Sequence, residues 1–151
     1  MHDFSLFLGD LAATRRAGAW LASALRAGDV VLLRGDLGAG KTSLVQGIAE
    51  GLGVAHEVTS PTFALMQVHP SSTDACDLIH ADLYRVGDPD EVEAIGLLDC
   101  LGADDAICCV EWPDVLGERL RGLAVFELTL RHDGTGRSVT LRAPRSLPAP
   151  P

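Results

Sequence analysis

A glycine-rich run between an apolar segment and a helical pattern constrains the fold of this chain more than any other feature. The run reads Gly35-Asp36-Leu37-Gly38-Ala39-Gly40-Lys41-Thr42. The wholly apolar residues 30–33 precede it, and such a short run is typical of a strand buried on both faces. Apolar residues recur at helical spacing over 41–52, and Gly53 ends that pattern. Strand, glycine turn and helix in this order predict an α/β domain.

The residue types in this run suit the binding of phosphate groups. Glycines let backbone N–H groups approach an anion without a Cβ clash, and the following helix directs its positive dipole end at the same place. Lys41 is the only lysine among twelve cationic residues, and its slim ammonium fits between phosphates better than a guanidinium does. The Thr42 hydroxyl suits Mg²⁺. We expect ATP or ADP with Mg²⁺; adenine is favoured only because no N-K-x-D guanine motif is present.

Residues 35–42 match G-x-x-x-x-G-K-[ST], the pattern of the phosphate-binding turn called a P-loop. A P-loop site also needs an acidic residue that holds Mg²⁺ or orients water, and two acidic residues follow apolar runs in this chain. Asp82 follows residues 78–81 and Glu111 follows residues 107–110. Glu111 closes the more apolar run and is the favoured acid, whereas Asp82 has the alternative of capping the turn before Tyr84. Trp112 either packs near the nucleotide or is a partly buried aromatic at the rim.

The rest of the chain reads as further helices and strands around this unit. We expect helices over residues 11–26 and after an Asp88 cap, strands over 76–83 and 106–110, and a hairpin of 125–130 with 138–141. Residues 59–62 form either a loop that senses the γ-phosphate or a plain turn around Pro61, leading into a strand that ends by residue 68. Residues 69–74 read as an exposed loop. The domain is predicted to cover residues 1–143, followed by a proline-rich, disordered tail over 144–151.

Length and composition limit the class of protein. The 151 residues suit one domain, and the net charge of −9 disfavours direct binding to nucleic acid. We expect a cytoplasmic location, because no apolar run approaches the roughly 20 residues that span a bilayer and no signal-peptide pattern is present. The four cysteines form no CxxC pair and are expected to be reduced structural thiols.

Four stretches together resemble the TsaE family, also called YjeE, the P-loop ATPases of bacterial threonylcarbamoyladenosine tRNA modification. They are residues 35–42, 59–63, 82–85 and 110–113, and their order and spacing match over about residues 11–141. The resemblance implies a single P-loop NTPase-like domain with a mixed, mostly parallel central sheet flanked by helices and a C-terminal β-hairpin. It also implies ATP hydrolysis that is slow without partners, by an accessory factor of the TsaD–TsaB complex that meets tRNA only indirectly.

The resemblance also assigns roles to residues. It implies that Lys41, Asp82 and Glu111 are catalytic, and that Thr42 and Glu111 bind Mg²⁺. The nucleotide-binding residues that it implies are Thr14, Gly38, Ala39, Gly40, Lys41, Thr42, Ser43 and Trp112. Two other functions stay open at this point: a small P-loop kinase that phosphorylates a metabolite, and a nucleotide-binding module that does not hydrolyse its ligand.

Overall fold

The computed structural model describes residues 1–55, 57–61, 64–71 and 76–151. The elements in these ranges alternate between strands and helices along most of the chain. They are β1 (His2–Leu8), α1 (Leu11–Ala22), β2 (Val30–Arg34), α2 (Lys41–Gly51), β3 (Met66–His69), β4 (Asp77–Asp82), α3 (Pro89–Ala94), α4 (Leu97–Cys100), β5 (Ala106–Glu111), the 3₁₀ helix η1 (Pro113–Leu120), β6 (Val125–Asp133) and β7 (Gly136–Ala143).

All strands of the described ranges join one seven-stranded sheet in the order β1-β7-β6-β2-β5-β4-β3. The central strands β6, β2, β5 and β4 run parallel, whereas β7 and β3 run antiparallel to their neighbours. β1 pairs antiparallel with β7 and so has the direction of the central strands. The predicted mixed, mostly parallel sheet is confirmed, and the predicted hairpin is β6 with β7.

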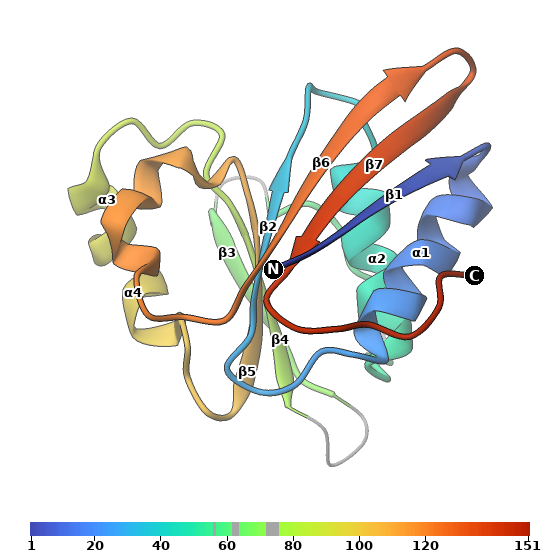
Figure 1. Ribbon diagram of the computed structural model, residues 1–151. Helices are drawn as coiled ribbons and strands as arrows, with labels where there is room; N and C mark the ends of the chain where they lie inside the picture. Colours follow the sequence, from blue (N-terminus) through green and yellow to red (C-terminus); the bar gives the residue numbers. More distant parts are fainter. Residues whose placement is uncertain (56, 62–63, 72–75) are drawn as a thin grey trace.

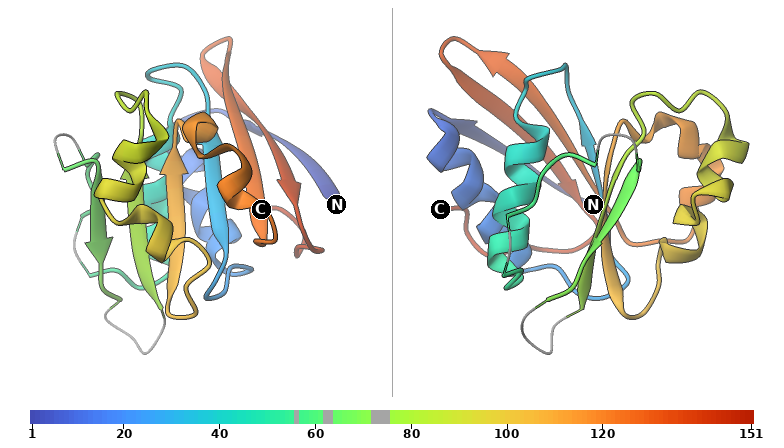
Figure 2. Two further views of the ribbon diagram at one scale, coloured as in Figure 1. Left: turned by 90° about the vertical axis from the view of Figure 1, so that its left-hand side faces the viewer. Right: turned by 180° about the vertical axis from the view of Figure 1, so that it is seen from behind.

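Helices cover both faces of this sheet (Figure 1). α1 and α2 lie side by side on one face, and α3, α4 and η1 lie on the other, as the two turned views also show (Figure 2). Each face has its own apolar core: one joins α1 and α2 to the sheet, and the other lies under the helices of the opposite face. β2 and β5 belong to both cores, which explains why their sequences are apolar at every position except the polar residue that ends each strand.

Several elements differ in extent from the sequence expectations. The first helix ends at Ala22 rather than at residue 26. The hydroxyl of Ser23 donates to the Trp20 carbonyl, and the Asp29 carboxylate accepts from the Arg26 N–H, so local side-chain bonds replace the next helical turn. The expectation of an exposed loop from residue 69 is wrong at His69, which ends β3 and is buried; residues 72–74 of that stretch lie outside the described residues.

The start of the third helix agrees with its sequence signal. The Asp88 side chain accepts a hydrogen bond from the Asp90 N–H at 2.9 Å, and Pro89 is the first helical residue. Gly96, in the left-handed conformation at φ 83°, then separates α3 from α4. Val92, inside α3, is fully buried.

The C-terminal residues 144–151 contain no helix or strand, yet part of them contacts the domain. Arg145 donates to the buried carboxylate of Asp29 and to the Ala24 carbonyl, and its guanidinium lies 4.9 Å from the centre of the Phe126 ring. Leu147 packs against the core. The disordered tail therefore stays a prediction only for residues beyond this anchor. Across the described ranges, no helix combines the length and apolar character needed to cross a membrane.

Candidate functional site

The glycine-rich run forms the connection between β2 and α2, at the carboxyl end of the sheet's central strand. Gly38 and Gly40 have φ values of 78° and 102°, which a residue with a Cβ rarely adopts. Gly40 is the residue immediately before the helix, so the N–H groups of the first turn of α2 are directed toward the loop. This loop has the backbone geometry of an anion-binding turn at a helix N-terminus.

Lys41 lies inside this turn rather than in solvent. It is only 5% exposed, and its ammonium donates to the carbonyl oxygens of Gly35 and, at 3.0 Å, Asp36. The ammonium also lies 4.2 Å from the centre of the Trp112 ring. Burial lowers the pKa of Lys41 from its ordinary value, although three nearby carboxylates, led by that of Glu111, oppose the shift.

Glu111 is the centre of a buried polar cluster at the end of β5. Thr42 donates its hydroxyl proton to the Glu111 carboxylate at 3.1 Å, so the start of α2 is tied to the end of this strand. His80, which is fully buried in β4, lies with its Nε2 2.7 Å from the same carboxylate. An ionised carboxylate can only accept, so when Glu111 carries its charge Nε2 of His80 is the donor in this contact.

Asp82 lies beside Glu111 because β4 and β5 pair in register at these two residues. One oxygen of Asp82 accepts from the Tyr84 N–H at 3.0 Å, and the other accepts from the Ser60 hydroxyl at 3.3 Å. The alternative role expected for Asp82, capping the turn before Tyr84, is therefore present in the structure. It does not remove Asp82 from the site, since Ser60 and Asp82 also line the cavity described next.

A cavity of about 290 Å³ brings most of the predicted site residues together. The P-loop side of its wall comes from Leu37, Gly38, Gly40, Lys41, Thr42 and Ser43. The opposite side comes from Ser60, Asp82, Glu111 and Trp112. Trp112 has an unusual positive φ of 55° and lies next to Tyr84, with ring centres 4.9 Å apart. The cavity thus combines one ammonium, a helix N-terminus and two carboxylates.

Two predicted residues lie outside the cavity wall. Ala39 is buried beneath the loop, with 1% of its surface exposed. Thr14 is buried in α1, donates its hydroxyl proton to the Asp10 carbonyl, and has its methyl group near the position that a Cβ of Gly40 would take. Of the predicted γ-phosphate loop, residues 59–61 are described, whereas Thr62 lies outside the described residues.

Sequence reasoning missed two residues that contact the site. His80 lies within a mostly apolar run that reads as a strand, and the signal for its role is a lone imidazole two positions before Asp82. Arg137 of β7 donates to the Gly38 carbonyl at 3.1 Å, so the C-terminal hairpin holds the P-loop from the side opposite β5. No local pattern marks Arg137, because this contact joins residues that lie far apart in the chain.

The donor set of the cavity fits a phosphate group with a hard divalent cation. The glycines keep the loop free of side chains where a phosphate would lie, and Lys41 supplies the positive charge. The Thr42 hydroxyl and the Glu111 carboxylate are oxygen donors of the kind that Mg²⁺ prefers. The arrangement can therefore bind a phosphate-bearing ligand and orient water beside it.

Comparison with known proteins gives a consistent family. The model of the family described as "Threonylcarbamoyl adenosine biosynthesis protein TsaE" matches residues 8–139. The tRNA threonylcarbamoyladenosine biosynthesis protein TsaE of Streptomyces coelicolor is 49% identical over 107 residues, which cover 70% of this chain and 71% of the relative. The protein of the same name from Synechocystis is 42% identical over 118 residues, covering 76% and 73%.

A solved structure agrees with these sequence matches. The crystal structure of Bacillus subtilis YdiB superimposes with a TM-score of 0.70 at 28% identity, and the match covers 94% of this chain and 86% of that one. The fold of the domain is thus shared with a solved structure. This chain belongs to the TsaE family of tRNA threonylcarbamoyladenosine biosynthesis.

Proposed function

We propose that this chain is an ATP-binding, slowly hydrolysing P-loop protein that acts as a nucleotide-dependent accessory factor of a TsaD–TsaB complex in threonylcarbamoyladenosine modification of tRNA. The observation that carries the proposal is the single cavity in which Lys41, Thr42, Asp82 and Glu111 meet. Family membership supplies the biological process. The net charge of −9 favours contact with tRNA through the partner proteins rather than by this chain.

Each side chain of the cavity has a defined part in this proposal. Lys41 exchanges the carbonyls of Gly35 and Asp36 for phosphate oxygens, while the N–H groups at the start of α2 bind the remaining oxygens. The Thr42 hydroxyl and the Glu111 carboxylate would hold Mg²⁺, which would neutralise charge on the transferred phosphoryl group.

The two acidic residues have different roles in the proposed hydrolysis. Glu111 is tied to Thr42 and His80, so its position is fixed relative to the P-loop, and it orients the attacking water. Asp82 lies beside it and is held by Ser60, which places a second carboxylate where it can act as a switch or accept a proton. The Trp112 ring closes the site over the Lys41 ammonium.

Substitution of Lys41 tests the site. Lys41→Ala is expected to abolish nucleotide binding, measured by titration of a fluorescent ADP analogue. Lys41→Arg keeps the charge but is expected to bind poorly, because a planar guanidinium does not fit the turn. Arg119→Ala is the matched control, since this exposed arginine on η1 lies outside the cavity. Undiminished binding by Lys41→Ala would refute the proposed site.

Hydrolysis and partnership need separate assays. Glu111→Gln is expected to retain nucleotide affinity and lose phosphate release, and normal turnover in this variant would refute its role. A pull-down from bacterial lysate with ATP or ADP is expected to recover TsaD and TsaB. A small kinase, the alternative function, would instead transfer phosphate to a metabolite, which the same reaction mixture analysed for phosphorylated products would detect.

A further inference from the structure

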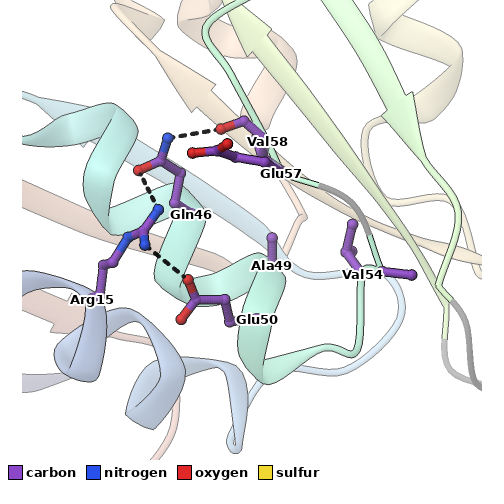
Figure 3. Close-up of a pocket in the computed structure, with 8 residues that line it drawn as sticks. Arg15, Gln46, Ala49, Glu50, Val54, Glu57 and Val58 are labelled. Atoms are coloured by element: carbon purple, nitrogen blue, oxygen red, sulfur yellow. Dashed lines mark hydrogen bonds and ion pairs between the residues drawn. The ribbon is translucent and has the colours of Figure 1, made fainter.

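A second polar link leaves α2 one turn after the residues of the site. Gln46 lies four positions after Thr42, so the two side chains emerge from the same side of the helix. The Gln46 amide donates from Nε2 to the Val58 carbonyl at 2.7 Å and accepts at Oε1 from the Arg15 guanidinium at 3.0 Å (Figure 3). Both ends of this amide are therefore used, and its orientation is fixed.

Arg15 is held in turn by the same helix. Its second terminal nitrogen lies 3.3 Å from the Glu50 carboxylate, one turn beyond Gln46 on α2 (Figure 3). Arg15 thus bridges α1 to two successive turns of α2 and presents a fixed donor to the Gln46 amide oxygen. The amide nitrogen is left directed at the Val58 carbonyl.

The segment that receives this hydrogen bond also reaches the site. Val58 is buried, with 2% of its surface exposed, and two residues later the Ser60 hydroxyl donates to Asp82. The described segment 57–61 is therefore tied at one point to α2 and at another to the end of β4. α2 itself is tied through Thr42 to Glu111 at the end of β5. These links form a closed circuit around the cavity.

We propose that Gln46 is a positioning residue, which holds segment 57–61 against α2 so that Ser60 stays in contact with Asp82. The inference rests on the proposed function, because the reaction for which Asp82 is positioned is ATP hydrolysis. α2 begins at Lys41 and Thr42, so the Gln46 bond joins the helix that carries these residues to Val58 and, two residues later, to Ser60. Gln46 does not line the cavity and acts only through this segment.

An isosteric substitution breaks the link to Val58 and keeps the others. In Gln46→Glu the side chain still accepts from Arg15, but a carboxylate next to this guanidinium is ionised and cannot donate to the Val58 carbonyl. Glu50→Gln is the matched control, since it weakens the Arg15 ion pair in the same network and leaves the Gln46 bond to Val58 in place.

Two measurements on the full chain test the proposal. Amide hydrogen exchange over residues 57–61 is expected to rise about fivefold in Gln46→Glu, the factor that corresponds to loss of one ordinary hydrogen bond. ATP turnover is expected to fall by about the same factor, with affinity for Mg-ADP unchanged within about twofold. Glu50→Gln is expected to match the wild type in both. Adding Gln46→Glu to Ser60→Ala is expected to cause little further loss of turnover, because both act on Asp82.

The outcomes separate this inference from the function on which it rests. Unchanged exchange in Gln46→Glu overturns the tether, and raised exchange with normal turnover overturns its positioning role. A loss of Mg-ADP affinity equal to the loss of turnover also overturns it, since that result indicates general damage to the P-loop. If the wild-type chain does not hydrolyse ATP, the proposed function fails, and the exchange measurement still decides whether Gln46 holds the segment.

Discussion

Replacing Gly47 by alanine is expected to destabilise this protein, although the same change stabilises an ordinary helix. Gly47 lies in the interior of α2, and a Cβ built there would lie 2.2 Å from the Arg15 carbonyl oxygen. It would also lie 2.9 Å from two further backbone atoms of Arg15. These atoms belong to the backbone of α1, which cannot move aside as the end of a flexible side chain can. The close approach of the two helices therefore depends on the missing side chain.

Two opposing terms set the magnitude. Alanine is preferred over glycine in a helix interior by about 1 kcal/mol. Against this, the helices must separate by most of an ångström before the new contact reaches the 3.0 Å that real Cβ atoms respect. Overpacking of this kind costs up to about 3 kcal/mol. The net loss is about 2 kcal/mol, which for a chain of this size corresponds to a fall in Tm of about 4–8 °C.

Thermal unfolding followed by circular dichroism measures this change, with Gly87→Ala as the control. A Cβ at Gly87 meets no heavy atom within 4 Å and its φ is not positive, so that variant is expected to lie within about 0.5 kcal/mol of the wild type. Gly18 of α1 makes the reciprocal approach, 2.4 Å from the Leu44 carbonyl oxygen, and Gly18→Ala is expected to behave like Gly47→Ala.

The double variant gives a sharper test of the same geometry. Once one alanine has pushed α1 and α2 apart, the second meets less resistance, so the combined loss for Gly18→Ala with Gly47→Ala is expected to be smaller than the sum of the single losses. A Tm for Gly47→Ala equal to or above that of the wild type would show that the helices separate freely. That result would refute the explanation from close packing.

Three further predictions concern other parts of the chain. His80→Leu removes the imidazole that contacts the Glu111 carboxylate and is expected to lower ATP hydrolysis about tenfold. His80→Gln keeps an N–H donor and is expected to retain most of the hydrolysis. Equal losses of hydrolysis in the two variants would contradict the idea that His80 positions Glu111. Deleting residues 144–151 removes Arg145, so the buried Asp29 carboxylate loses its ion-pair partner and keeps only its hydrogen bond from the Arg26 N–H. Denaturant unfolding is expected to show a loss of about 3 kcal/mol, whereas deletion of residues 148–151 alone is expected to cause no loss. Burial raises the pKa of Cys108 to about 12. At pH 8 this thiol is therefore expected to resist a thiol reagent in the native protein and to react after unfolding. Rapid labelling of Cys108 in the native protein would contradict this expectation.

The unit around the P-loop could be predicted because its signals are local. Residues 30–33 are apolar at every position, the glycines follow at once, and the helical pattern begins within the motif. β2 and α2 accordingly lie close to their expected bounds. Gly47 was also visible in the sequence, but a glycine inside a helix reads as a weak point there. Only the position of α1 shows that Gly47 is the place where the backbones of the two helices come close together.

Features that depend on distant partners could not be predicted in the same way. β1 pairs with β7, so that His2 lies opposite Ala143, and most of its residues remain partly or fully exposed. Phe4, Leu6 and Leu8 alternate toward the core in the manner of a half-buried strand, but this local pattern does not indicate that the partner is a strand at the other end of the chain. The anchoring of Arg145 to Asp29 is of the same kind, since the composition of the tail indicated only disorder.

The two acidic residues of the site, Asp82 and Glu111, are brought together by the pairing of strands in the sheet. Asp82 and Glu111 are far apart in the chain, and either could have been a surface carboxylate at a strand end. The strand order places β5 between β2 and β4, and the parallel register sets Asp82 directly beside Glu111. Alternation along β4 then turns His80 to the same face as Asp82, where it reaches the Glu111 carboxylate. A one-residue change in the register of β4 would remove His80 and Asp82 from Glu111 together, so the pairing of these two strands determines the site as strictly as the P-loop does.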